Sequence, residues 1–426
     1  MLVGTAARRV AIIGGMRIPF ARGNGAYADV GNEEMLTATL RALAERFGLV
    51  GERVDEVAAG AVMKHPSQWN LTRESVLRSG LAPETPGLDL QRACGTSLEA
   101  AIVLGNKIAL GQIESGIAAG VDTVSDPPIV FARSFQQLLL RSYRARGALQ
   151  RLLPWLALRP RDFKPVLPGM AEPRTGLSMG ESCELMAKTW GISREEQDQL
   201  ALESHMKASA AYEAGFFQDL VHEYHGLARD NNIRADTSLE KLGKLKPVFD
   251  PAGTLTAGNS TPMTDGASSL LLASEAWARA RNLPVLAYLT YAKVAAVDYI
   301  DGQEGLLMAP AYAVPRMLRD ARLTLQDFDV YEIHEAFAAQ VLCTLKAWND
   351  PVFCRERLRL AGVLGSIDRA RLNLKGGSIA IGHPFAATGT RVLATVAKIL
   401  EERRARRGLV SVCTAGGMGV TAIVER

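Results

Sequence analysis

The sequence predicts an α/β fold with a largely parallel sheet, built from two similar halves. Apolar runs of strand length alternate with segments of helical spacing in both the N-terminal and the C-terminal parts of the chain. A turn–helix–strand unit follows Cys94, and a second unit of similar pattern follows His383. Because α/β sheets build their sites where strands end, we expect the two turns to be neighbours.

The N-terminal part contains five predicted elements, each bounded by glycine or polar turn residues. They are a strand at 8–20 that enters a glycine-rich turn, a helix at 35–48, a strand at 54–63, a strand–turn–helix unit at 88–111 and a strand at 115–125. This alternation is typical of βαβ units.

The C-terminal part repeats the alternation. We predict a strand at 285–297, helices at 311–324 and 335–348 on either side of a strand at 327–334, a strand–turn–helix unit at 378–402 and a strand hairpin at 408–425. The repeat is one of pattern and not of residue identity.

Between the halves, residues 126–255 break this rhythm. The segment 133–164 carries one acid, Asp162, against eight cations: Arg133, Arg141, Arg144, Arg146, Arg151, Arg159, Arg161 and Lys164. Its leucines share one face of a helical wheel with several arginines opposite, although Pro154 interrupts the pattern. Such a basic amphipathic helix can lie on an anionic membrane or dock a partner. The alternative is a surface helix packed on its own domain.

Composition narrows the classes of function. The chain has 426 residues, 48% of them hydrophobic, 22% charged and 6% aromatic, with a formal net charge of +4. This is ordinary for a globular protein and offers no case for nucleic-acid binding. The five cysteines show no metal-ligand spacing, so we expect no metal site. We see no secretory signal and no charge-free run of membrane-spanning length, which together favour the cytoplasm.

Cys94 begins a helix in the stretch QRACGTSLEAA. The helix dipole and the free N–H groups there are expected to lower the thiol pKa and favour the nucleophilic thiolate. The alternative is a small buried core cysteine.

Two histidines are candidates for proton transfer and oxyanion binding. His383 lies in a turn before a helix, and a neutral imidazole is the usual base for a catalytic thiol. His334 begins a helix after a strand and is suited to hold an enolate oxygen. The alternatives are a turn histidine that caps a backbone group at 383 and an N-cap histidine at 334.

Cys413 ends a strand and leads into the glycine-rich stretch TAGGMGV. Backbone N–H groups in such a loop can form an oxyanion hole. A second thiol there can serve as a redox partner, or as the proton donor and acceptor for a carbon acid. The alternative is a strand-end cysteine packed beside glycines. A dinucleotide fingerprint and a P-loop are both missing, which disfavours a nicotinamide or nucleoside triphosphate enzyme.

Six stretches together resemble the thiolase family in order and spacing over nearly the whole chain. They are ACGTSLEAA, MGES, LKPVFDPAGTLTAGNSTPMTDGAS, HEAFAAQ, GGSIAIGHPFAATG and CTAGGMGV. The resemblance implies a five-layered α-β-α-β-α fold. It also implies an N-terminal half at 1–125 and 256–284, an inserted loop domain at 126–255 and a C-terminal half at 285–426.

The resemblance also implies a ping-pong acyl transfer. Cys94, activated by His383, would attack 3-ketoacyl-CoA, and His334 and His383 would hold the acetyl-CoA enolate oxygen. Cys413 would protonate C2, and the backbone N–H groups of Cys94 and Ala415 would hold the tetrahedral oxyanion. Ala386 and Ala415 stand where glycine is commoner in the family.

Coenzyme A enters this scheme as a co-substrate, with no tightly bound cofactor. By resemblance, its channel is lined by Met179, Arg234, Phe249, Ala257, Thr261 and Phe337. The HEAFA form resembles β-subunits of fatty-acid β-oxidation complexes, whose basic insertion engages a membrane or a hydratase/dehydrogenase α-subunit. Segment 133–164 is similar to that insertion, and a homodimer or higher homo-oligomer is expected.

Three other functions remain open at this point. One is a biosynthetic acetoacetyl-CoA thiolase, although many thiolases carry asparagine where this chain has His334. A 3-ketoacyl synthase uses one cysteine with two histidines, but it forms its carbanion by decarboxylation and needs no thiol at the position of Cys413. A lipid-binding or scaffold protein on the same fold would be expected to lose at least one of the four catalytic residues.

Overall fold

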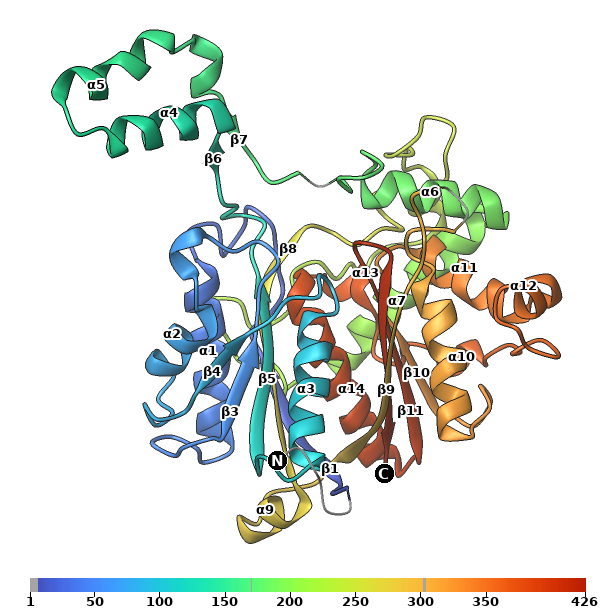
Figure 1. Ribbon diagram of the computed structural model, residues 1–426. Helices are drawn as coiled ribbons and strands as arrows, with labels where there is room; N and C mark the ends of the chain where they lie inside the picture. Colours follow the sequence, from blue (N-terminus) through green and yellow to red (C-terminus); the bar gives the residue numbers. More distant parts are fainter. Residues whose placement is uncertain (1–6, 170, 302–303) are drawn as a thin grey trace.

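The computed structural model describes residues 7–169, 171–301 and 304–426, and within them a 10-stranded sheet forms the centre of the molecule (Figure 1). Nine of its strands follow the order β10-β11-β12-β9-β1-β8-β5-β3-β4, and β2 pairs with β8 off this path. The strands are β1 Val10–Arg17, β2 Ala21–Arg22, β3 Glu56–Ala59, β4 Gly87–Asp89, β5 Ser115–Asp122, β8 Thr264–Ser274, β9 Ala287–Ala296, β10 Val330–Ile333, β11 Arg407–Thr414 and β12 Met418–Glu425.

Helices divide this sheet into a five-layered arrangement (Figure 1). Outside the N-terminal strands lie α1 Asn32–Arg46 and α2 Leu71–Arg78, and outside the C-terminal strands lie α10 Ala309–Ala321, α11 Ala338–Asn349 and α12 Pro351–Glu356. Between the two parts of the sheet lie α3 Thr96–Ala109 and α14 Thr388–Arg403, which pack on each other. Helix α3 packs on the N-terminal strands β1, β3, β5 and β8, and α14 packs on strands of both parts. The five-layered α-β-α-β-α prediction is therefore confirmed.

The remaining helices are short or belong to the segment between β5 and β8. They are α4 Arg133–Arg144, α5 Ala148–Leu152, α6 Met179–Trp190, α7 Arg194–Glu213, α8 Leu239–Gly243, α9 Glu275–Ala280 and α13 Ser378–Ile381, with 3-10 turns η1 Pro66–Gln68, η2 Leu153–Ala157, η3 Pro160–Phe163, η4 Arg369–Arg371 and η5 Phe385–Ala387. The chain leaves the body after β5 and returns in β8, as the inserted-domain prediction requires, although its boundaries stay a prediction.

The prediction of a largely parallel sheet is wrong. Only β3·β4, β3·β5 and β10·β11 pair in parallel among the described residues, and the other neighbours are antiparallel. The long excursion after β5 lets the chain return as β8 in the opposite direction, and a tight turn folds β12 back on β11. The sequence pattern missed β8, whose run of small and apolar residues is buried throughout.

A second strand prediction is also wrong. Residues Ser378–Ile381 form one turn of helix, α13, and not a strand before His383. Four consecutive apolar or small residues show neither a period of two nor one of 3.6, so their pattern cannot separate the two structures.

The central helices approach so closely that only glycine fits between them. A Cβ atom on Gly389 of α14 would lie 2.1 Å from the backbone nitrogen of Leu98 in α3. A Cβ atom on Gly120 of β5 would likewise lie 2.1 Å from the carbonyl oxygen of Ala386. These contacts bring the turn before α3, which carries Cys94, to the turn before α14, which carries His383.

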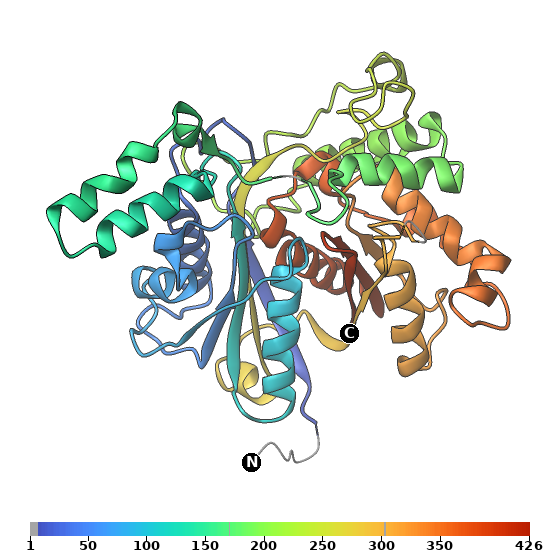
Figure 2. The ribbon, with the colours of Figure 1, turned by 45° about the horizontal axis from the view of Figure 1, so that its top comes forward.

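Residues 130–166 form an arm that stands away from the body (Figures 1 and 2). A two-stranded ladder of β6 Val130–Phe131 and β7 Pro165–Val166 forms its base. The expected single amphipathic helix is instead a helical hairpin, because the helical backbone breaks at Ala145 between α4 and α5. The arm also does not pack on its own domain, which was the alternative; α4 packs against α5, η2 and η3.

Candidate active site

Cys94 lies in a tight turn that immediately precedes α3. Ala93 adopts a left-handed backbone with φ of 43°, and Gly95 is the N-cap residue. The Thr96 hydroxyl donates to the Ala93 carbonyl at 2.7 Å and accepts the Arg92 N–H at 2.9 Å. The turn is thus held from both sides, and it places the thiol beside the N-terminus of α3 as the sequence predicts.

The helix N-terminus does not decide the protonation of Cys94. Burial raises the pKa of its thiol to about 12, and the carboxylates of Asp122 and Glu172 act in the same direction. The backbone N–H groups of Ala415 and of Cys94 itself hydrogen-bond to the sulfur and lower the pKa, but burial outweighs them. Burial therefore opposes the lowering of the thiol pKa that the helix start was expected to produce, and it disfavours the Cys94 thiolate in the ligand-free protein.

His383 follows Gly382, whose φ of 107° suits glycine only. Its backbone N–H donates to the Thr264 hydroxyl at 3.2 Å, and its Nδ1 bonds the Thr388 hydroxyl at 2.6 Å. Asp122 at the end of β5 fixes the same turn by accepting the Ala386 N–H at 2.8 Å. Burial and the charge of Arg391 lower the His383 pKa to about 3, so the imidazole is neutral.

His334 follows β10 and is 1% exposed. Its backbone N–H donates to the Ser411 carbonyl at 2.8 Å, and its Nδ1 bonds the Ser378 hydroxyl at 2.8 Å. The N-cap of α11 is Phe337, so the idea that His334 begins or caps this helix is wrong. Burial, His383 and Arg391 lower the His334 pKa well below its usual range.

The two imidazoles face one another, with ring centroids 4.1 Å apart and planes inclined by 46°. The Nε2 atoms of both rings are buried, and neither has a hydrogen-bond partner among the described residues. Buried polar atoms are normally paired, so two adjacent orphans indicate a place where a polar substrate atom binds. Neither histidine caps a backbone group through its ring.

Cys413 lies on β11, opposite Gly419 of β12, and is 2% exposed. Its strands adjoin the Cys94 turn, because a Cβ atom on Gly95 would lie 2.7 Å from Cγ2 of Val420 and 3.1 Å from Cγ2 of Thr414. Burial first, and then the charge of Cys94, raises the Cys413 pKa well above its usual range. The structure thus brings Cys413 close to the Cys94 turn, and the start of α3 after Cys94 meets the start of α14 after His383, where the Thr390 N–H donates to the Ser97 hydroxyl at 2.9 Å. Burial disfavours the Cys413 thiolate.

Several residues that hold this group in place were missed at the sequence level. Asn373 bridges the end of β10 to Glu335, accepting the Ile333 N–H at 2.9 Å and donating to the Glu335 carboxylate at 2.6 Å. That carboxylate also accepts from the Ser204 hydroxyl and the Ile379 N–H. In the sequence, the only signal for these residues is that they are polar and stand beside apolar runs. Many other residues share that signal, so it cannot identify these as part of the site.

A cavity of about 710 Å³ is lined mainly by residues between 205 and 263, together with residues 22–24 and Ile379. Four of the six residues predicted for coenzyme A line it: Arg234, Phe249, Ala257 and Thr261. Met179 and Phe337 do not; Phe337 packs edge to face on Phe249, with ring centroids 5.8 Å apart. Arg22 and Lys241 also line the cavity and were missed at the sequence level. With Arg234 they bring three cations to it, of which Lys241 is ion-paired at 2.7 Å with Asp236 in the same lining.

Family models match almost the whole chain. The model of the N-terminal thiolase domain matches residues 10–276, and that of the C-terminal thiolase domain matches residues 283–426. The chain belongs to the thiolase family. It is therefore an acyltransferase, and its five layers are the thiolase fold.

Individual thiolases agree with this assignment. The chain is 40% identical over 431 aligned residues to the 3-ketoacyl-CoA thiolase of Yersinia pestis strain Pestoides F, covering 100% of this chain and 98% of the relative. It has the same identity and coverage with the 3-ketoacyl-CoA thiolase of Yersinia pseudotuberculosis serotype O:1b. The crystal structure of the Bacillus anthracis acetyl-CoA acetyltransferase superimposes with a TM-score of 0.81 at 30% identity, covering 99% of both chains.

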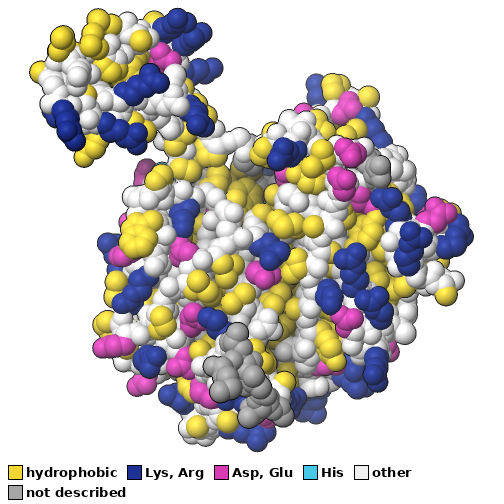
Figure 3. All heavy atoms as spheres, in the orientation of Figure 1, with side chains coloured by type: hydrophobic (Ala, Val, Ile, Leu, Met, Phe, Trp, Pro, Cys, Tyr) yellow, Lys and Arg dark blue, Asp and Glu magenta, His cyan; other side chains and the backbone are white. Residues whose placement is uncertain are grey.

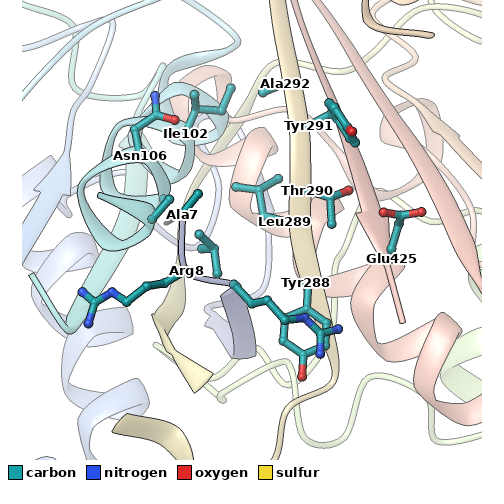
Figure 4. A pocket seen from close by; sticks show the side chains of 14 residues that line it. Ala7, Arg8, Ile102, Asn106, Tyr288, Leu289, Thr290, Tyr291, Ala292 and Glu425 are labelled. Carbon is teal, nitrogen blue, oxygen red and sulfur yellow. The ribbon is translucent and has the colours of Figure 1, made fainter. Parts of the chain in front are cut away.

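A second cavity of about 400 Å³ lies between α3 and β9, away from these residues (Figure 4). Its charged side chains are already paired: Arg8 with Glu114, Arg9 with Glu275 and Glu425 with Arg407. It therefore offers no open polar group comparable to the two Nε2 atoms. In the described part of this thiolase no cluster of three or more potential metal ligands occurs, and no helix has the length and apolarity of a membrane span.

Proposed function

We propose that this thiolase is a 3-ketoacyl-CoA thiolase that uses Cys94, His334, His383 and Cys413. The observation that carries the proposal is the geometry of the site: the His334 and His383 ring centroids lie 4.1 Å apart, with Nε2 atoms that are unpartnered among the described residues, and the turn of Cys94 adjoins the strands that carry and pair with Cys413. In this proposal Cys94 is the nucleophile and His383 is its base, Cys413 exchanges a proton with C2 of the substrate, and His334 donates a hydrogen bond to the enolate oxygen. The names of the two Yersinia relatives support the same substrate class.

In the first half-reaction, the Cys94 sulfur attacks the 3-keto carbon while its proton passes to Nε2 of His383. The bond between C2 and C3 then breaks, which leaves an acyl group on Cys94 and the enolate of acetyl-CoA. Hydrogen bonds from Nε2 of His334 and of protonated His383 stabilise the enolate oxygen. Cys413 gives its proton to C2, and this is why a raised thiol pKa suits it.

In the second half-reaction, the thiol of a new coenzyme A molecule gives its proton to the Cys413 thiolate and attacks the acyl carbon. The tetrahedral oxyanion accepts hydrogen bonds from the backbone N–H groups of Cys94 and Ala415, which already bond the Cys94 sulfur in the free protein. When the acyl thioester leaves, His383 returns its proton to Cys94. The cycle restores all four groups.

We place coenzyme A in the cavity of about 710 Å³, whose three cations suit its phosphates. Arg22, Arg234 and Lys241 would bind the nucleotide end, and Phe249 would pack on the pantetheine or the adenine. Met179 and Phe337 then act behind the cavity wall, through Phe249.

The test is trapping of the acyl-enzyme. Incubation with a 3-ketoacyl-CoA should add one acyl group to the wild type by intact mass, and Cys94→Ser should abolish both this adduct and thiolysis. Cys354→Ala, which changes a buried thiol on α12, is the matched control and should keep both. Acylation of the Cys94→Ser protein at the wild-type rate would refute the nucleophile assignment.

The competing synthase function is decided by Cys413. A decarboxylating synthase needs no thiol at C2, so it would tolerate Cys413→Ala, whereas a thiolase would not. A chain-length series of 3-ketoacyl-CoA substrates, assayed in both directions, then separates a β-oxidation enzyme from an acetoacetyl-CoA thiolase. We favour β-oxidation, because the basic arm has no role in a reaction on short soluble substrates.

We propose that the arm at 130–166 contacts an anionic membrane surface, with a hydratase/dehydrogenase α-subunit as the other occupant to test. Its surface mixes apolar and basic side chains with little acid (Figure 3). Tyr143 is 85% exposed, Leu156 84% and Leu149 72%. Apolar side chains beside arginines are what an interfacial helix presents to lipid headgroups and acyl chains.

Vesicle binding tests the arm. Arg141→Glu, Arg144→Glu and Arg151→Glu together should abolish cosedimentation with phosphatidylglycerol vesicles while short-chain thiolysis persists. The matched control places three glutamates on the exposed cluster Arg403, Arg404 and Arg406 and should bind as the wild type does. Deletion of residues 135–160 should have the effect of the arm variant. If deletion leaves vesicle binding unchanged but prevents capture of a purified α-subunit, the arm is a subunit contact.

For assembly and location, we propose a homodimer or higher homo-oligomer in the cytoplasm, associated with the membrane through the arm. Sedimentation velocity of the arm deletion tests the assembly, because a dimer that forms through the body should survive the deletion, and the vesicle experiment tests the membrane association.

A further inference from the structure

A buried arginine lies behind His334 and contacts no substrate space. Arg391 of α14 has a side chain only 1% exposed, and its Nη1 donates to the Glu332 carboxylate at 3.1 Å. Arg391 Nε and Glu332 Oε2 have no partner in the described part of the chain. A buried ion pair that leaves such atoms unpaired contributes little stability after desolvation, so its presence calls for another reason.

Arg391 reaches His334 through one hydroxyl. Its Nη2 donates to Ser378 Oγ at 2.8 Å, and the same oxygen lies 2.8 Å from Nδ1 of His334. A guanidinium has no acceptor, so Ser378 must accept this bond through a lone pair. Among the described residues, Nδ1 of His334 is the only acceptor within reach of the remaining hydroxyl hydrogen.

The protonation of His334 follows from this chain of donors. Nδ1 accepts the Ser378 hydrogen and carries none of its own. Burial and the nearby Arg391 and His383 keep the ring neutral, since they lower its pKa well below the usual range. A neutral imidazole has one N–H, which therefore lies on Nε2, the buried atom that has no partner among the described residues.

His383 is held differently. Its Nδ1 bonds the Thr388 hydroxyl at 2.6 Å, but no cation donates to that hydroxyl in the described structure. Thr388 is therefore free to donate to Nδ1 or to accept from it, and both tautomers of His383 are open. A base that takes a proton on Nε2 needs its lone pair there, with Nδ1–H donating to Thr388.

We propose that Arg391, acting through Ser378, fixes His334 as the Nε2–H tautomer, while the uncommitted Thr388 hydroxyl leaves His383 free to act as the base. Arg391, Glu332 and Ser378 are thus positioning residues. The two imidazoles lie side by side but have different roles: His334 donates a hydrogen bond through Nε2–H, and His383 accepts a proton. The role of His334 as a hydrogen-bond donor to the enolate oxygen rests on the thiolase reaction proposed above, but the assignment of its tautomer does not.

Nitrogen NMR of the full-length protein, labelled with ¹⁵N-histidine, reads the tautomer directly. The chain has six histidines, and His334→Asn identifies the ring signals that belong to position 334. We expect a protonated Nε2 and an unprotonated Nδ1 at neutral pH. A protonated Nδ1 at position 334 in the wild type would overturn the proposal, and this measurement needs no buried variant to fold.

Variants then separate positioning from packing. Ser378→Ala should split the His334 ring signals into two tautomers and lower kcat about 10- to 100-fold with little change in KM, as for other groups that orient a catalytic ligand. Ser378→Thr retains the hydroxyl and should restore both. Thr388→Val is the matched control, because it should alter the ring signals of His383 and leave those of His334.

The outcomes also distinguish this proposal from the proposed function. If the wild type has the stated His334 tautomer but shows no CoA-dependent cleavage, the tautomer proposal stands and the thiolase reaction is refuted. If Ser378→Ala shows normal thiolysis and the same single His334 tautomer as the wild type, the role of Ser378 and Arg391 in fixing the tautomer is refuted, and the thiolase reaction is not.

Discussion

His334 and His383 lie with their ring centroids 4.1 Å apart, although one follows β10 and the other precedes α14. Each ring is held at Nδ1 by a hydroxyl, from Ser378 or Thr388, and each presents a buried Nε2 without a partner. Two adjacent imidazolium ions would repel, and burial disfavours both charges, so the resting pair is neutral. Burial likewise disfavours the thiolate of Cys94, because it raises the pKa of that thiol.

The rate at which Cys94 is alkylated should therefore rise with the pH. Because burial raises its pKa to about 12, the thiolate fraction and the rate of iodoacetamide inactivation should rise about tenfold per pH unit between pH 6 and 9. The measurement is the pseudo-first-order inactivation rate of the ligand-free protein at low ionic strength.

The groups that act on the pKa of this thiol besides burial are Asp122, Glu172 and the N–H groups of Ala415 and Cys94. None of them is a cation that would hold a thiolate at low pH. A rate that is already constant from pH 6 upward would show a resting thiolate–imidazolium pair instead and contradict this electrostatic account.

Cys413 should matter for the carbon acid more than for acylation. We expect Cys413→Ala to slow hydrogen–deuterium exchange at C2 of acetyl-CoA by at least about 100-fold, since a positioned proton donor contributes on that scale. Transfer of the acyl group to Cys94 from a simple acyl-CoA, followed by intact mass, should slow far less. Equal losses in both assays would assign Cys413 to packing.

His205 offers a test of linkage outside the reacting groups. Its Nδ1 accepts the Arg234 N–H at 3.2 Å, and burial together with the charge of Arg234 lowers its pKa to about 4. In the unfolded chain His205 binds a proton near pH 6.5, whereas in the folded protein it does so only near pH 4. The contribution of neutral His205 to the unfolding free energy is therefore complete above pH 6.5 and falls as the pH drops toward 4.

His205→Gln removes this titration and retains an acceptor for Arg234. The difference in unfolding free energy between the wild type and the variant should shrink by about 1.4 kcal/mol per pH unit from pH 6.5 down toward 4, up to about 3 kcal/mol in total. Urea unfolding at several pH values measures it, with the exposed His222→Gln as control. A difference that does not change with pH would mean that His205 has the same pKa in the folded and unfolded states.

Gly389→Ala should destabilise the junction on which the site depends. The added methyl group would meet the backbone nitrogen of Leu98 at 2.1 Å, so α3 and α14 must move apart. We expect a loss of about 3 kcal/mol in urea unfolding, at the upper end for overpacking, together with reduced kcat. Gly362→Ala, where no atom lies within 4 Å, should change neither quantity.

The chemistry of this site could be predicted from the sequence because each reactive residue belongs to a short stretch with its own local signal. Cys94 stands before an amphipathic helix, Cys413 before a glycine-rich turn, and the motifs follow in family order. The prediction failed where the information was not local. The direction of β8 depends on where an excursion of more than a hundred residues returns, and no pattern within β8 records that.

Protonation states were also out of reach of the sequence. A helix start predicts a low thiol pKa for Cys94, yet burial raises it, and burial depends on strands and turns from both halves of the chain. The same holds for Ser378 and Thr388, which are ordinary small polar residues until the fold sets them against Nδ1 of the two histidines.

The sequence by itself therefore determined which groups react, the family to which the chain belongs and the basic, apolar character of the arm. The tertiary structure decided the strand directions, the hairpin form of the arm, the neutral state of both thiols and both imidazoles, and the hydroxyls that orient the rings. The physical reason is one of range. Residue type and periodicity act over a few neighbours, whereas desolvation and hydrogen-bond geometry depend on contacts between segments far apart in the chain.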